Sequence, residues 1–270
     1  MNHLLRSAAP ISDTGWRELD REAQQHLLPA LASRRVVDFS GPLGWEHSAT
    51  NLGRVSGIDP ADACLRASQR RVLPLAELRA DFAISRAELC DLDRGAVDID
   101  LGALHAAAQR IARAENVAVF HGWPGAAIVG ISHAVANSAI ALGTDFAEYP
   151  KCVAQAVVGL LSAGVSGPYG LVIGPDGYTG VVETTEDGGL VVFDHLREIL
   201  GGPIVWAPGV LGALVLSLRG EDFLFESGQD LSLGYDHHDA ESIHLYLEES
   251  FTFRVATPEA AVVLDHDKAP

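Results

Sequence analysis

The sequence predicts an α+β fold with a protruding hairpin arm. Three observations predict it. Helical and strand segments occur without a regular strand–helix–strand alternation, one strand near the C-terminus is very long, and one polar, turn-rich stretch has too few apolar residues to bury a core. Apolar residues make up 48% of the 270 residues, which is enough for a packed core and excludes disorder for most of the chain.

The N-terminal part predicts a helix followed by a short strand. Ser12 or Asp13 can cap a helix in which apolar residues recur at helical spacing, and Pro29 should kink or end it. Residues 34–39 resemble a short strand. The glycine- and proline-containing residues 41–44 end it.

Residues 45–75 predict a hairpin arm. They are polar and turn-rich, with a Gly-Ile-Asp-Pro turn at residues 57–60 between two partly alternating segments. An isolated two-stranded hairpin is only marginally stable in water, so the arm implies a partner surface.

Two helices are expected in the middle of the chain. The first covers residues 101–122, with Asp100 as its cap and with Glu115 on its otherwise apolar face. The second covers residues 149–163 and ends at Gly164.

A buried strand over residues 170–174 follows, then a turn at Pro175-Asp176-Gly177 and an acidic, glycine-containing loop over residues 183–194. Residues 204–218 form the longest apolar run, but Pro208, Gly209 and Gly212 interrupt it. The run therefore predicts strand, turn and strand, because a membrane helix needs about 20 continuous apolar residues.

The long C-terminal strand shows an alternating pattern. Ile243, Leu245, Leu247, Phe251, Phe253 and Val255 fall on one face, and Glu249 interrupts this apolar set once. The preceding Asp236-His237-His238-Asp239 is interpreted as a solvated turn between strands rather than a metal site. Adjacent histidines on an extended chain point in different directions.

Charge and cysteine usage exclude several functions. The formal net charge of −17 argues against a protein that binds the phosphate backbone of nucleic acids. Three scattered cysteines without CxxC spacing predict buried thiols in a reducing compartment, and the apolar stretch at the N-terminus is too short for a secretion signal. We therefore expect a cytoplasmic protein that binds neither nucleic acid nor membrane.

The sequence carries no recognisable catalytic motif. GxSxG, P-loop and GxGxxG patterns are absent, and the eleven histidines show no HExxH or HxH spacing. We expect no catalytic residues, no metal ligands and no enzymatic activity. The acidic loop, with Glu183, Glu186, Asp187 and Asp194, is typically a solvated tip, but copies of it meeting at a symmetry axis would favour the passage of cations.

Several segments carry a family resemblance, in order over nearly the whole chain. They are residues 4–10 with the helix bearing Trp16, then 34–38, 41–46, 75–82, 88–95, 167–169, 219–223, 228–235 and 249–253. Together they resemble the encapsulins, or linocin-type bacteriocin family, which are bacterial protein-shell subunits. Gly220-Glu221-Asp222 departs from the family's Gly-Gly-Asp pattern.

The resemblance implies the tailed-phage major-capsid (Hong Kong 97 type) fold. Its expected parts are an N-terminal helix and the start of a peripheral domain (1–45), an extended arm (46–74), the peripheral domain with a spine helix (75–130), an axial domain (131–222), and peripheral-domain strands with a C-terminal tail (223–270). The length resembles that of compact members, which form icosahedral homo-oligomers of about sixty copies. The arm contains no lysine, so a lysine–asparagine cross-link of the kind found in some capsids is not expected.

The resemblance also implies a cargo enzyme inside the shell, either a dye-decolourising peroxidase or a ferritin-like protein. The cargo is recruited by a short C-terminal peptide, and the implied roles are defence against oxidative stress or iron storage. Arg34 and Asp38 match the family's cargo groove, and local pattern extends it to Leu31, Val37 and Leu231. We expect Asp38 to pair with a basic residue of the cargo peptide, and Glu183, Glu186 and Asp187 to line a pore.

Some encapsulins resemble flavin binders through a tryptophan that aligns with Ala87 of this chain. Ala87 has no aromatic face on which a flavin could stack, so no cofactor is expected.

Two alternative functions remain open at this point. A prophage major capsid protein would be expected to carry a scaffolding or removable extension, and none precedes Pro10. A hydrolase or protease would turn over substrate without any cargo.

Overall fold

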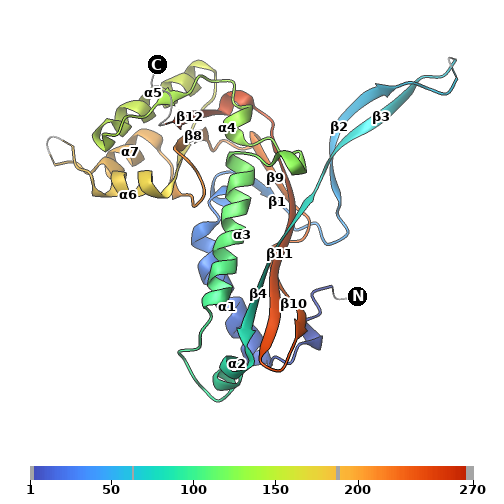
Figure 1. Ribbon diagram of the computed structural model, residues 1–270. Helices are drawn as coiled ribbons and strands as arrows, with labels where there is room; N and C mark the ends of the chain where they lie inside the picture. Colours follow the sequence, from blue (N-terminus) through green and yellow to red (C-terminus); the bar gives the residue numbers. More distant parts are fainter. Residues whose placement is uncertain (1–2, 63, 187–188, 266–270) are drawn as a thin grey trace.

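The computed structural model of the chain describes residues 3–62, 64–186 and 189–265. A long helix and a long strand, α3 (Gly102–Phe120) and β11 (Ser242–Val255), run side by side along the length of the body. A compact α/β unit lies at one end of this spine, and a narrow hairpin projects away from it (Figure 1). The predicted α+β class is confirmed, and the molecule is far from spherical.

The helix α1 (Asp13–Ala30) begins and ends where the sequence predicts. The Ser12 hydroxyl accepts a hydrogen bond from Gly15 N at 2.9 Å, and the helix ends one residue after Pro29. Its apolar face packs on α3 and contributes the buried Trp16, Leu19 and Leu27. The strand predicted over residues 34–39 is wrong in its first half. Ser33–Arg35 is a 3-10 turn, and β1 covers only Asp38–Ser40.

The spine helix α3 starts one residue later than expected. Its N-cap position is Leu101, so the prediction of Asp100 as the cap residue is wrong in position. The Asp100 carboxylate still accepts a hydrogen bond from Gly102 N at 2.9 Å, so it satisfies a free donor of the first turn.

The spine sheet is built around β11. Its strand order is β1, β9 (Phe223–Ser227), β11 and β10 (Ser232–His238), and β4 (Ala76–Ser85) also pairs with β11. The short strand β1 joins β9 in parallel, whereas the other pairings are antiparallel. The predicted turn at residues 236–239 is wrong for its first three residues, because β10 extends through His238.

The compact unit contains the second sheet. Its order is β5 (Ile140–Ala141), β12 (Ala261–Asp265), β8 (Ala213–Ser217), β6 (Tyr169–Ile173) and β7 (Ile204–Trp206). Three helices pack with it: α5 (Tyr149–Ser162), α6 (Pro175–Glu183) and α7 (Val192–Leu200). The predicted turn at Pro175 is wrong. Proline is well suited to the first position of a helix, and here it begins α6.

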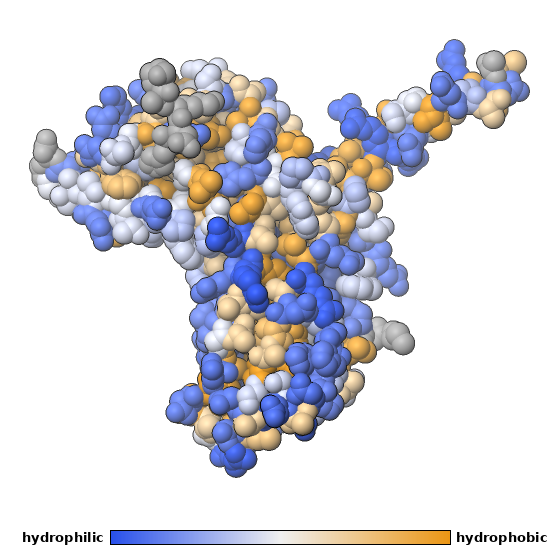
Figure 2. Space-filling view, in the orientation of Figure 1, coloured by the Kyte–Doolittle hydropathy of each residue, from blue (hydrophilic) through white to orange (hydrophobic). Residues whose placement is uncertain are grey.

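The hairpin arm is confirmed. The strands β2 (Ala49–Ile58) and β3 (Ala67–Pro74) pair with each other and with no further strand of the described chain. Val55, Ile58, Leu65 and Val72 are each at least half exposed on it. Figure 2 shows the arm standing free of the body, with apolar patches along it.

The remaining elements are short. They are α2 (Arg86–Asp93), α4 (Ile131–Ala134) and the 3-10 turns Arg6–Ala8, Pro124–Ala126, Phe146–Glu148 and Pro258–Ala260. Within the described residues, no helix combines the length and apolar character needed to span a membrane.

Candidate functional site

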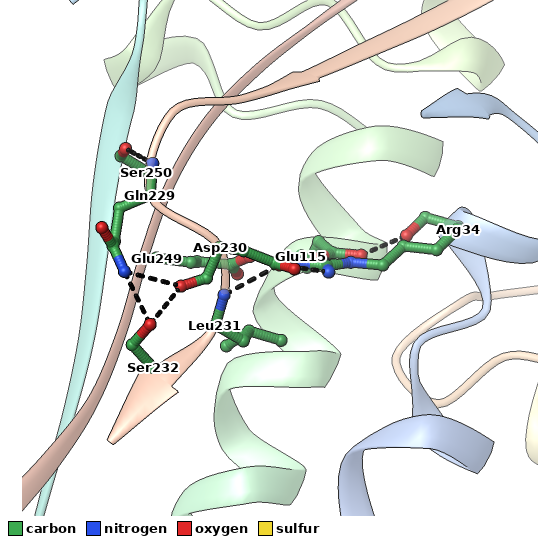
Figure 3. A network of polar contacts seen from close by, with 9 residues as sticks. Arg34, Glu115, Gln229, Asp230, Leu231, Ser232, Glu249 and Ser250 are labelled. Atoms are coloured by element: carbon green, nitrogen blue, oxygen red, sulfur yellow. Dashed lines mark hydrogen bonds and ion pairs between the residues drawn. The ribbon is translucent and has the colours of Figure 1, made fainter. Parts of the chain in front are cut away.

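Arg34 is the centre of a charge cluster where four parts of the chain meet. It follows α1, and its guanidinium contacts Glu115 of α3, Asp230 before β10, and Glu249 of β11 (Figure 3). Nε lies 2.8 Å from Glu115 Oε2, Nη1 lies 2.6 Å from Asp230 Oδ1, and Nη2 lies 2.8 Å from Glu249 Oε2. One side chain therefore fixes the segment after α1 both to the spine helix and to the spine sheet.

Neighbouring hydrogen bonds hold the same segment in place. Ser33 N donates to Asn116 Oδ1 at 3.1 Å, and the Ser33 hydroxyl donates to the Glu115 carboxylate. Asn116 Nδ2 donates to the Ala30 carbonyl at 2.8 Å, which closes the end of α1 onto α3. Asp230 is oriented by Leu231 N, which donates to its Oδ1 at 2.8 Å.

The cluster contains three carboxyl groups and one guanidinium, so its charges do not balance if all are ionised. Glu249 is 2% exposed, and burial together with the nearby Glu115 raises its pKa well above the usual value. This favours the protonated, uncharged form of Glu249. Burial alone would lower the pKa of Arg34, but the surrounding acidic groups, Glu115 first among them, raise it by more, so the guanidinium stays charged.

The structure places the five predicted cargo residues in different surroundings. Leu31 is buried in the apolar core between α1, α3 and the spine sheet, and the half-buried Leu231 packs against the same core. Val37 packs against a second apolar core, which includes the buried residues of the compact unit. Asp38 is exposed, and its Oδ2 accepts a hydrogen bond from Glu221 N at 2.7 Å.

An exposed aromatic residue beside Arg34 was missed by the sequence reasoning. The Phe39 ring stacks on Phe225 with a centroid distance of 5.4 Å, and the guanidinium carbon of Arg34 lies 5.0 Å from the Phe39 centroid. The side chain of Phe39 remains 37% exposed. The sequence indicates this position only by a phenylalanine between two polar residues, Asp38 and Ser40, in a short expected strand.

The predicted acidic tip connects α6 to α7 at the far end of the compact unit (Figure 1). Glu183 is the exposed last residue of α6, whereas Asp194 lies in the first turn of α7. Glu186 Oε1 lies 2.8 Å from His195 Nδ1, so α7 fixes this carboxylate. Asp187 lies outside the described residues.

Ala87 lies in the first turn of α2 and is exposed. Its backbone N donates to the capping Ser85 hydroxyl at 3.2 Å. A methyl group at this position offers no ring on which a flavin could stack.

Comparison with known proteins gives a consistent result over nearly the whole chain. The sequence model of the family described as "Linocin_M18: Encapsulating protein for peroxidase" matches residues 1–252. The chain is 47% identical to a type 1 encapsulin shell protein of Rhodospirillum rubrum, over 98% of this chain and 96% of that protein. It is 39% identical to a type 1 encapsulin shell protein of Mycobacterium tuberculosis, over 98% of this chain and all of that protein.

Solved structures match in fold. The virus-like particle from Pyrococcus furiosus gives a TM-score of 0.64 at 18% identity, over 93% of this chain and 99% of that chain. A protein of Mycobacterium phage Bobi gives a TM-score of 0.56 at 14% identity, over 89% of this chain and 91% of that chain. At these identities the likeness shows the Hong Kong 97 type fold alone, and it agrees with the fold that the sequence predicts.

Proposed function

This chain belongs to the encapsulin shell proteins, a family of nanocompartment shell subunits, and from that premise we propose that its shell encloses a cargo enzyme recruited by a short C-terminal peptide. The observation that carries the shell function is the arm. Its paired strands leave apolar side chains exposed on a hairpin that has no core of its own, and sister copies can cover them. We propose a closed cytoplasmic particle of about sixty copies, without catalytic activity of its own.

The cargo face that we propose surrounds Arg34. Phe39 offers an exposed aromatic surface, Val37 and Leu231 offer half-buried apolar edges, and Asp38 offers a carboxylate to a basic residue of the peptide. Arg34 is occupied by three carboxyl groups, so its role is to position this face rather than to bind the peptide carboxylate directly. Leu31 supports the face from within the core.

Co-expression with a tagged peroxidase or ferritin-like cargo tests this face. Asp38→Ala and Leu231→Asp should load less cargo per particle than the wild type, while the mass of the empty shell stays unchanged. Val97→Asp is the control for the added charge, because Val97 is 97% exposed in the loop between α2 and α3. Equal loading of all three variants would place the cargo contact elsewhere.

The acidic tip supports a second proposal about transport. Glu183 ends α6 and Glu186 lies in the loop that follows it, and copies of such a loop around a symmetry axis attract cations. Neutralising Glu186 and Asp187 together as glutamine and asparagine should slow iron uptake into a ferritin-loaded shell. An unchanged uptake rate would remove the tip from the transport route.

A further inference from the structure

Three metal-ligating side chains converge on the edge of the contact between α1 and α3. Glu22 and His26 are four residues apart on α1, so they lie on the same face one turn apart, and His105 lies in the first turn of α3. Glu22 Oε2 lies 2.9 Å from His105 Nε2 and 3.8 Å from His26 Nε2. All three ligand atoms lie within 4.8 Å of one another.

The helix packing beneath these side chains fixes their backbones. Leu19 and Leu27 of α1 and Leu104 of α3 are buried in the core directly beside them. The exposed fractions of the three side chains are 17% for Glu22, 35% for His26 and 31% for His105. The group is therefore held on rigid elements, yet open enough for an ion and its water ligands to enter.

We propose that Glu22, His26 and His105 bind one divalent transition-metal ion of the Zn²⁺ class. Two imidazoles and one carboxylate are the ligand set of three-residue zinc sites and of the 2-His-1-carboxylate iron sites, in which water fills the remaining positions. Tetrahedral ligands about 2.0–2.1 Å from Zn²⁺ lie about 3.3 Å from one another. The two distances from Glu22 Oε2 to the histidine Nε2 atoms, 2.9 and 3.8 Å, bracket that value.

A neighbouring side chain orients the Glu22 carboxylate. Arg21 Nη2 donates to Glu22 Oε1 at 2.7 Å, which occupies one carboxylate oxygen and leaves Oε2 directed at the histidines. The imidazole rings stack at a centroid distance of 3.8 Å with an angle of 25° between their planes. Binding requires both rings to turn out of this stack so that their Nε2 atoms point at the ion, and the partial exposure of the two side chains leaves room for the movement. Such an ion would join the N-terminal helix to the spine helix.

A purely structural role is the competing explanation, because the bond between Glu22 and His105 joins α1 to α3 without any metal. Calorimetric titration separates the two. The whole assembled shell is stripped with a chelator and titrated with Zn²⁺, and the retained zinc per subunit is measured by elemental analysis. The proposal predicts one tight site per subunit and a melting temperature that rises with Zn²⁺.

Matched variants test the assignment. His26→Gln with His105→Gln should lose the tight site, and Glu22→Gln should weaken it by about 10-fold or more while keeping an acceptor for His105. The control is His237→Gln with His244→Gln, which removes another stacked histidine pair, with a centroid distance of 4.1 Å, and should bind Zn²⁺ like the wild type.

If the double variant at positions 26 and 105 fails to assemble, the Glu22→Gln variant alone decides. The proposal is overturned if the wild-type shell retains no more Zn²⁺ per subunit than the double variant, or if Glu22→Gln binds as tightly as the wild type. It is also overturned if the control pair accounts for the bound zinc. The shell is expressed without cargo, so that no cargo protein contributes to the bound zinc.

Discussion

Replacing Arg34 with methionine tests whether the charge cluster holds the spine together. The change keeps much of the apolar stem but removes the guanidinium from three carboxyl groups, of which the Glu115 side chain is 0% and the Glu249 side chain 1% exposed. Removing one partner of a buried ion pair costs about 3–5 kcal/mol, because the other charge stays buried and unpaired. For a chain of this size, about 2–4 °C are lost per kcal/mol, so the melting temperature should fall by roughly 6–20 °C.

Differential scanning fluorimetry of the purified particles measures this fall, with Arg35→Met as the control. Arg35 is the exposed neighbour, and substitutions at such surface positions change stability by about 0.5 kcal/mol or less. Glu249→Gln should be far milder than Arg34→Met, because the raised pKa of Glu249 already favours an uncharged group there. A drop for Arg34→Met no larger than that for Arg35→Met would refute the reasoning.

The same cluster predicts a pH dependence with a definite sign. The pKa of Glu249 is raised in the folded state, so between its ordinary value near 4.5 and the raised value only the folded chain binds this proton. Stability from this group is therefore present at low pH and is lost as the pH rises through that window. Glu249→Gln should flatten this part of the profile of melting temperature against pH. An unchanged slope would show that Glu249 does not titrate there.

Three further perturbations have defined outcomes. Gly130→Ala should destabilise the fold in a thermal melt, because its new Cβ would overlap the backbone of Gly122, whereas Gly159→Ala in α5 has open space and should be neutral or stabilising. The purified shell should show no flavin absorbance after incubation with flavin mononucleotide, and Ala87→Trp should gain it if the position alone decides. Replacing residues 52–72 with a short Gly-Ser linker should leave folded but unassembled subunits in size-exclusion chromatography.

The sequence predicts the parts whose patterns are local. The alternation of β11, the helical spacing of α1 and α3, and the polar arm all follow from residues close together in the chain. The family segments add the overall fold. Even the two charges that interrupt apolar faces, Glu115 and Glu249, are visible as exceptions in the sequence, and both turn out to be partners of Arg34.

The features that the sequence does not predict depend on contacts between segments that lie far apart in the chain. Arg34 and Glu249 are 215 residues apart, so their pairing depends on how α1, α3 and β11 pack. Only Asp38–Ser40, at the end of the predicted strand, pairs with β9, and the residues before it include the 3-10 turn that carries Arg34. Likewise, the spacing of Glu22 and His26 is visible on α1, but only the packing of α3 brings His105 to them.

The mass and shape of the purified full-length protein test most directly whether the exposed arm is completed by sister copies. Mass measurement combined with electron microscopy should show closed hollow particles of about sixty subunits of 28.6 kDa, or about 1.7 MDa. A folded protein that stays at 28.6 kDa at every concentration, with no particles on the grid, would contradict the account.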